Sequence, residues 1–432
     1  MPGAPPRGAR TPLPARAVRL VHLSDLHLGY RQYQRLTPTG INQREADVAT
    51  SFRRVVDKVI ELHPELVVIG GDVFHTVRPS NPAILHAFQQ FARLRAALPD
   101  TLVVMIAGNH DTPRSTETGC ILQLFASLGM DVVTDAPQRL EFPDRDLSIL
   151  CVPDVFGSRP KLVPEGSARH QVLLLHGEVE GMLDAGVVPA DRAALEISKE
   201  ELGASRWSYV ALGHYHVYRE IAPNAFYAGS IDYTSANAWG EIREQRAAGI
   251  PGKGIIERDL DTGRQWFHPI APSRELVDLP PIVARDMTAA EVDAAIRAAV
   301  EGCPGGIADK VVRLVVRQIP RHITRELDHK AIRDFKRRAL HFLLDTHRPD
   351  PVRAGSTGSG APGRRPSLAD VVREKLQTRA VDPQVDRAAL VSLGLHYLAL
   401  AESEHAGTGV VAGAAAPDPG GAGEGDAEGG AA

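Results

Sequence analysis

Short apolar runs alternate with amphipathic stretches over the first two thirds of the chain. Between Phe52 and Ile60 the apolar side chains recur every three or four residues, which predicts a helix, and a second such stretch covers 85–92. Apolar runs predict strands at 18–23, 66–69, 102–106, 147–152, 172–175, 209–212 and 226–228. Strands this apolar are usually covered on both faces. The pattern therefore predicts a layered α/β domain in which helices flank the sheets.

Toward the C-terminus the pattern changes. Thr288 and Glu291 have the spacing of a capping box, and they precede a helical repeat at 292–300. A strand is predicted at 311–316, and a second helical repeat covers 332–342. These elements predict a small second α/β domain.

Composition marks the remaining boundaries. Residues 349–366 are rich in Pro, Gly, Ser and Arg, which is typical of a linker. Two more helices are predicted beyond it, at 367–376 and 382–400, and the second is more apolar than one buried face requires. The predicted organisation is a disordered leader at 1–16, a large layered domain at 17–268, a second domain at 269–348, a linker at 349–366, a helical segment at 367–405 and a disordered tail at 406–432.

Charge and cysteine content bear on the binding of nucleic acid and on the cellular compartment of the protein. The 432 residues carry a net charge of -4, so any attraction for nucleic acid must come from local basic clusters or bound metal. The three cysteines are far apart in the sequence, which argues against a disulfide framework and fits a reducing compartment. No run reaches the roughly 18 to 20 apolar residues of a membrane span. We therefore expect a cytoplasmic protein with no membrane segment.

Candidate chemistry is concentrated in five short blocks, each of which follows a predicted strand. Strand ends in layered α/β proteins converge on one edge, where ligands usually bind. Carboxylate, imidazole and amide groups without thiolate suit Mn, Fe or Zn. Each block alone is weak evidence, but five in this position indicate a metal site. The blocks are Ser24-Asp25-Leu26-His27, Gly71-Asp72-Val73-Phe74-His75, Gly108-Asn109-His110-Asp111, His176-Gly177 and Gly213-His214-Tyr215-His216.

These blocks resemble the ordered motifs of the calcineurin-like metallophosphoesterase superfamily: D-x-H, G-D, G-N-H-D/E, H and G-H-x-H. The resemblance implies a metallophosphoesterase β-sandwich flanked by helices, with two metal ions. Two ions roughly 3.5 to 4 Å apart can clamp a phosphodiester and stabilise both oxygens of an in-line displacement. By this match one ion is held by Asp25, His27, Asp72 and His216, and the other by Asp72, Asn109, His176 and His214, with Asp72 bridging them.

The resemblance also assigns three catalytic residues that bind no metal. His110 is implied to face the scissile phosphate, where it stabilises charge or protonates the leaving oxygen, and Asp111 is implied to orient it. His75 matches the archaeal and eukaryotic form of one branch of the superfamily, in which this histidine helps to orient the DNA phosphate. The alternative for His75 is a residue that merely lies near the site.

That branch is the SbcD-type DNA double-strand-break repair nucleases. The run V-H-L-S-D-L-H-L-G at 21–29 resembles its opening, and Gly229-Ser230 and Lys253-Gly254 resemble later positions. The resemblance implies an exonuclease and endonuclease with two Mn²⁺ ions, with Fe or Zn as other metals that suit the site. It further implies a capping domain at 269–348, a homodimer, and a partner-docking segment at 367–405 for an SbcC-type SMC-like ATPase. An extra charged segment at 241–245 departs from the family, and we expect it to touch no ligand.

Other interpretations remain open at this stage. A phosphodiesterase or phosphatase for small phosphoesters, such as cyclic nucleotides, would share the five blocks. A non-enzymatic scaffold would have lost ligands, and none is missing here. The C-terminal helices could fold back on the chain rather than bind a partner. The basic residues of the second domain could bind DNA phosphates or form only a solvated face; they are Arg321, Arg325, Lys330, Arg333, Lys336, Arg337 and Arg338.

Overall fold

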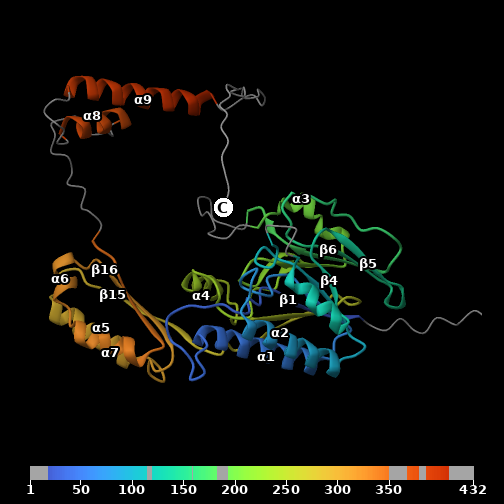
Figure 1. Ribbon diagram of the computed structural model, residues 1–432. Helices are drawn as coiled ribbons and strands as arrows, with labels where there is room; N and C mark the ends of the chain where they lie inside the picture. Colours follow the sequence, from blue (N-terminus) through green and yellow to red (C-terminus); the bar gives the residue numbers. More distant parts are fainter. Residues whose placement is uncertain are drawn as a thin grey trace, which may run out of the picture. The chain divides into compact units, whose positions relative to one another are not determined.

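The computed structural model (Figure 1) describes residues 18–113, 119–157, 159–181, 193–349, 367–378 and 386–407. The predicted leader and nearly all of the predicted linker and tail lie outside these residues. The chain divides into two compact units, residues 1–350 and 351–432. The first unit contains both the predicted large domain and the predicted second domain. No helix in the described part of the chain is long and apolar enough to cross a membrane.

Two six-stranded sheets form the large domain. The first has the order β14 (Gln265–Pro269), β13 (Gly254–Asp259), β1 (Arg19–Leu23), β2 (Leu66–Ile69), β3 (Leu102–Ile106) and β4 (Asp131–Val133). The second has the order β11 (Arg219–Ala222), β12 (Ala225–Tyr227), β10 (Tyr209–Gly213), β7 (His170–His176), β6 (Leu147–Val152) and β5 (Gln138–Phe142). The central strands β1, β2 and β3 run parallel, as do β6, β7 and β10. Their carboxyl ends therefore share an edge within each sheet.

The alternation of side chains along each strand builds the layers. In β1, Leu20 belongs to a buried cluster that includes Val172 and Tyr209 of the second sheet. Its neighbour Val21 belongs to the cluster on the opposite face, because successive strand residues point to opposite faces. Helices α1 (Gln43–Leu62) and α2 (Asn81–Ala97) cover that face and lie side by side (Figure 1). The predicted sandwich of two sheets flanked by helices is confirmed.

Shorter elements complete the large domain, and several of them connect the strands near the candidate site. They are the 3-10 helices η2 (Ile121–Leu128), η3 (Pro143–Arg145) and η4 (Ala204–Arg206), the strands β8 (Glu178–Val179) and β9 (Glu196–Ile197), and the helices α3 (Lys199–Leu202) and α4 (Ala238–Ala247). Strands β8 and β9 pair with each other.

The second domain is a parallel sheet of β15 (Leu276–Val283), β16 (Val311–Arg317) and β17 (His341–Thr346) with α5 (Ala289–Glu301), α6 (Arg321–Glu326) and α7 (His329–Arg338). The capping box of Thr288 and Glu291 is present at the start of α5. One boundary prediction is wrong: the helix expected at 332–342 ends at Arg338. Ala339 is extended, with φ -71° and ψ 161°, and Phe342 lies in β17.

The second unit contains two helices, α8 (Leu368–Thr378) and α9 (Arg387–Gly407). They pack closely, because a Cβ at Gly394 would overlap the side chain of Leu376. Arg387 also donates a hydrogen bond to the carbonyl of Leu376, at 3.2 Å. The predicted start of the last helix at 382 falls outside the described residues, and the described helix begins at Arg387.

Candidate metal centre

Side chains from both sheets meet at the carboxyl ends of the parallel strands. Asp25 and His27 follow β1, and Asp72 follows β2. From the second sheet, His176 is the last residue of β7 and His214 follows β10 directly. Asn109 follows β3, and His216 lies two residues beyond His214. The structure therefore brings the seven predicted ligand residues to one edge.

The ligand atoms form two groups, and the carboxylate of Asp72 lies where the two groups meet. One group is Asp25, His27 and His216, and the other is Asp72, His176 and His214; within each, the atoms lie within 4.8 Å of one another. Nε2 of His27 is 2.9 Å from Nε2 of His216. Oδ2 of Asp72 lies 3.7 Å from Nε2 of His27 and 3.6 Å from Nε2 of His176. A carboxylate between two groups of nitrogen and oxygen donors fits a pair of divalent ions.

Neighbouring groups fix the orientation of the imidazole rings. Nδ1 of His176 donates to the carbonyl of Gly70 at 2.7 Å, so Nε2 faces Asn109 Oδ1 at 3.0 Å. His214 presents Nδ1 to the same Asn109 oxygen at 3.2 Å, while its Nε2 lies 3.2 Å from Glu178. Hydrogen bonds to the second ring nitrogen set the tautomer and basicity of a metal-binding histidine. Sequence reasoning missed Glu178, although it follows the His176-Gly177 block directly.

Four of the predicted ligands have an unusual backbone conformation. Asp25, His27, Asp72 and His214 have φ values of 53°, 44°, 51° and 109°. Positive φ in residues other than glycine costs of order 1–3 kcal/mol and is concentrated at functional sites. Hydrogen bonds between the loop after β1 and the loop after β2 stabilise this backbone conformation. Asp25 N donates to Gly71 O at 3.0 Å, and His27 N donates to Asp72 O at 2.9 Å. The β1 and β2 loops therefore form one unit.

Two glycines make this close approach of loops sterically feasible. A Cβ at Gly71, which has φ 93°, would lie 2.5 Å from Nδ1 of His176. A Cβ at Gly108 would overlap the carboxylate of Asp72 and lie 2.6 Å from its backbone nitrogen. In this structure the two glycines make room for the other loops of the site.

The three residues assigned to catalysis lie beside the first group. The ring of His75 has Nδ1 3.3 Å from Nδ1 of His27, and it stacks on His110 with a centroid distance of 5.2 Å. Nδ1 of His110 donates to the carbonyl of His75 at 2.7 Å. This carbonyl contributes to the orientation of the His110 ring. Asp111 accepts hydrogen bonds from the backbone of Val73, Phe74 and Gly108, and so ties two site loops together.

Burial and mutual charge shift the pKa values of the cluster. Burial, followed by the charge of Asp72, raises the pKa of Asp111 to about 7. Burial and the surrounding histidines hold the pKa of His27 well below its ordinary value. Burial lowers the pKa of His176, but the carboxylates of Asp72 and Asp25 outweigh it and leave that pKa raised. The site thus concentrates carboxylates and imidazoles in a buried space, an arrangement that favours cations.

The charged segment at 241–245 does contact a predicted ligand, so the expectation that it touches none is wrong. It forms part of α4, which begins after the N-cap Asn237. Oε1 of Glu241 lies 3.4 Å from Nδ1 of His216. Helix α4 brings the carboxylate there by packing onto the loop after β10, and this packing cannot be read from the local pattern.

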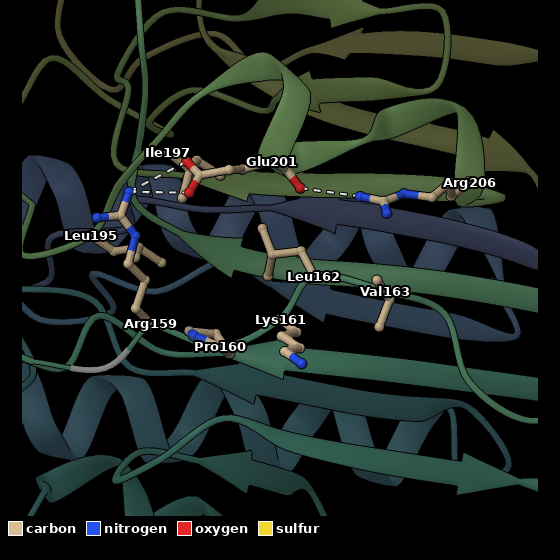
Figure 2. A pocket seen from close by; sticks show the side chains of 9 residues that line it. All are labelled: Arg159, Pro160, Lys161, Leu162, Val163, Leu195, Ile197, Glu201 and Arg206. Atoms are coloured by element: carbon tan, nitrogen blue, oxygen red, sulfur yellow. Dashed lines mark hydrogen bonds and ion pairs between the residues drawn. The ribbon is translucent and has the colours of Figure 1, made fainter.

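A hollow lies among other residues of the large domain (Figure 2). It has a volume of about 340 Å³, and none of its lining residues is a predicted ligand. Figure 2 shows Arg159 and Arg206 approaching Glu201 from opposite sides, Arg159 through the carboxylate at 3.2 Å and Arg206 through the backbone carbonyl at 3.3 Å. These contacts engage both arginines of the hollow, and we place the chemistry at the histidine-rich cluster.

Comparison with known proteins agrees with this geometry. Residues 18–218 match the sequence model of the calcineurin-like phosphoesterase family, and every predicted ligand lies in that range. This part of the chain is therefore similar to a calcineurin-like phosphoesterase domain.

Two relatives have names that describe a narrower class of protein than the family model does. Over 259 residues the chain is 27% identical to the DNA double-strand break repair protein Mre11 of Methanococcus maripaludis, covering 56% of this chain and 63% of that protein. It is 32% identical over 211 residues to the protein of the same name from Sulfurisphaera tokodaii, covering 46% and 49%. The chain thus spans between about half and three fifths of these relatives. The resemblance to a DNA-repair branch of the superfamily is confirmed.

Proposed function

We propose that the protein is a metal-dependent nuclease that hydrolyses phosphodiester bonds at DNA ends during double-strand-break repair. The observation that carries the proposal is the convergence of six predicted ligands into two groups with Asp72 between them, with the seventh, Asn109, beside His176 and His214. The DNA substrate is supported by similarity to proteins named for DNA double-strand break repair.

In this proposal Asp25, His27, Asp72 and His216 hold one ion, and Asp72, Asn109, His176 and His214 hold the other. Two such ions supply an activated water and stabilise the attacking and leaving oxygens of an in-line displacement. The nitrogen and oxygen donors suit Mn, Fe or Zn, and the resemblance to the SbcD-type nucleases favours Mn²⁺ among them. The protein's own contribution is to hold these donors on strained loops that are hydrogen-bonded to each other.

His110 and His75 act on the phosphate side of this centre. The hydrogen bond from Nδ1 of His110 to the His75 carbonyl fixes the orientation of the His110 ring. His110 would stabilise charge on the phosphate or protonate the leaving oxygen. His75 would orient the DNA phosphate, since its ring packs against both His27 and His110. Asp111 keeps the loop of His110 in place through the backbone contacts described above.

The second domain offers a surface for DNA, in the role of a capping domain. All seven basic residues noted in the sequence are exposed on α6 and α7. Lysine and arginine at such positions contact phosphates without reading sequence. This local positive charge could attract nucleic acid, whereas the net charge of -4 by itself does not.

The proposal extends to partners. A homodimer and an SbcC-type SMC-like ATPase rest on the resemblance, as does location in the cytoplasm. The unit of α8 and α9 would be the docking segment for the ATPase, because Leu393 and Tyr397 are 52% and 63% exposed. Exposed apolar side chains on paired helices are typical of a surface that binds another helix.

The test uses the purified full chain, Mn²⁺ and three substrates: linear duplex DNA, a closed circular duplex and a cyclic nucleotide. We expect degradation of the linear duplex and slow turnover of the cyclic nucleotide. Asp72→Ala should abolish activity because it removes the shared carboxylate. Asp57→Ala, which removes an exposed carboxylate from α1, is the matched control and should keep full activity. Intact linear DNA together with rapid turnover of the cyclic nucleotide would favour a small-molecule phosphodiesterase.

A further inference from the structure

A buried charged network lies behind His216, on the side of the ring opposite His27. It is built from Glu241 of α4, Lys253 just before β13, and Ser230. Lys253 is 2% exposed and Glu241 8%. Nζ of Lys253 donates to the backbone carbonyl of His216 at 2.7 Å and to Ser230 Oγ at 2.9 Å. It also forms a short ion pair with Glu241.

The carboxylate of Glu241 faces the inner nitrogen of the His216 ring. One oxygen accepts a hydrogen bond from Ser235 and lies 3.4 Å from the buried Nδ1 of His216. The other oxygen pairs with Lys253. Because Nε2 of His216 is directed at His27, a metal would be bound through Nε2, and Nδ1 must then carry the proton. A carboxylate beside Nδ1 favours that tautomer and makes Nε2 a stronger donor.

Lys253 holds both ends of this arrangement. It anchors the main chain of His216 through the carbonyl and the carboxylate of Glu241 through the ion pair. A buried ammonium group is costly unless it is paired and hydrogen-bonded. Lys253 meets that condition with three oxygen partners and lies 4.7 Å from the ring centroid of Tyr233.

The other group of ligands has a separate support. Glu178 lies beside Nε2 of His214, and the carbonyl of Gly70 accepts a hydrogen bond from Nδ1 of His176. Neither group belongs to the network behind His216. Each metal position therefore has its own set of orienting groups. A change in one set should affect one metal position only.

We propose that Glu241 and Lys253 form a positioning pair that sets the affinity of the metal position containing His216. The inference rests on the proposed two-metal function and extends it to Glu241 of the charged segment and to Lys253. Glu241 acts through His216, and Lys253 acts through Glu241 and the His216 carbonyl.

The test measures Mn²⁺ binding to the metal-free full chain by isothermal titration calorimetry, with thermal unfolding of the metal-free form alongside. The key variant combines Glu241→Met and Lys253→Met, since replacing a whole buried ion pair by apolar groups of similar volume usually preserves stability. We expect one site of unchanged affinity and one weakened by roughly 10- to 100-fold. Glu244→Gln is the control, because Glu244 lies on the same helix but pairs with Arg219, with its side chain 34% exposed. It should bind both ions normally.

A second set of variants identifies the affected position and protects against misfolding. Glu241→Gln keeps the volume and an acceptor, and should weaken the same site by roughly tenfold. Adding His216→Ala to the double variant should cause no loss beyond that of His216→Ala alone, because coupled residues are not additive. Wild-type affinity at both sites in the folded double variant or in Glu241→Gln would overturn the inference. A wild-type protein that binds fewer than two ions would instead overturn the two-metal function.

Discussion

His22 lies in the layer between the two sheets, where burial lowers its pKa to about 3 even though a backbone hydrogen bond involving Leu212 opposes the shift. Its Nδ1 is 3.1 Å from the hydroxyl of Tyr209 in the opposite sheet. The histidine is therefore neutral in the folded protein, and its polar contact crosses an otherwise apolar interface.

This burial predicts acid sensitivity. The folded-state pKa is lower than the unfolded value of 6.5, so the unfolded chain binds the extra proton as pH falls below 6.5. The His22 contribution to the free energy of unfolding should fall by up to roughly 1.4 kcal/mol per pH unit between pH 6.5 and 3. Urea unfolding of metal-free protein from pH 7.5 to 4.5 would show a shallower loss for His22→Gln. His322→Gln, at an exposed position in α6, should follow the wild type; equal slopes in all three proteins would contradict the prediction.

His75 makes a prediction about the mode of cutting. Because its ring contacts both His27 and His110, removing it should misplace the DNA end while leaving the ligands in position. A misplacement of about 1 Å can cost roughly a hundredfold in rate. We expect His75→Ala to lose exonuclease activity on linear DNA by about that factor and to lose less of its endonuclease activity on circular single-stranded DNA. An equal loss in both assays would argue against the orienting role.

At the scale of elements, the start of α5 is set by local chemistry. Thr288 accepts from Glu291 N, and the Glu291 carboxylate accepts from Thr288 N at 2.8 Å. Replacing an N-cap threonine by alanine typically costs ~1 kcal/mol. Thr288→Ala should therefore lower the free energy of unfolding of the second domain by about this amount in urea titrations. Mn²⁺ binding should stay unchanged, and a change in metal affinity would show that the cap acts on the centre.

The boundary between α7 and β17 shows where local pattern fails. Ile332, Phe335, Ala339 and Phe342 continue a helical spacing, and Ile332, Phe335 and Phe342 are all buried in one cluster. The chain nevertheless becomes extended at Ala339, and His341–Thr346 pairs in parallel with β16. Strand β17 forms because it pairs with β16, and this pairing is not visible in the local spacing of apolar residues.

At the scale of the whole molecule, the second unit carries the prediction about assembly. Leu393 and Tyr397 of α9 are exposed, and so is Leu368 of α8. Binding energy at such interfaces is concentrated in a few apolar and aromatic anchors. The variant Leu393→Asp with Tyr397→Asp should therefore weaken binding of the full chain to a purified SMC-like ATPase by at least roughly tenfold. Glu374→Lys on α8, also exposed, is the control. Undiminished binding would favour a tail that folds back on the chain.

By itself the sequence determined the strand positions and the candidate ligands, because both are local. The strands at 66–69, 102–106 and 147–152 have the observed bounds, since an apolar run next to a turn needs no distant information. Each ligand block follows its strand directly, so its place at the sheet edge was a consequence of the strand.

Only the tertiary structure decided what surrounds those ligands. Glu241 and Lys253 reach His216 across 25 and 37 positions of the chain, and Nδ1 of His110 donates to a backbone carbonyl from another loop. Backbone carbonyls carry no sequence signal, and a buried carboxylate on α4 is indistinguishable by pattern from an exposed one. Such contacts depend on how segments distant in sequence pack together, and this packing is fixed by the fold as a whole.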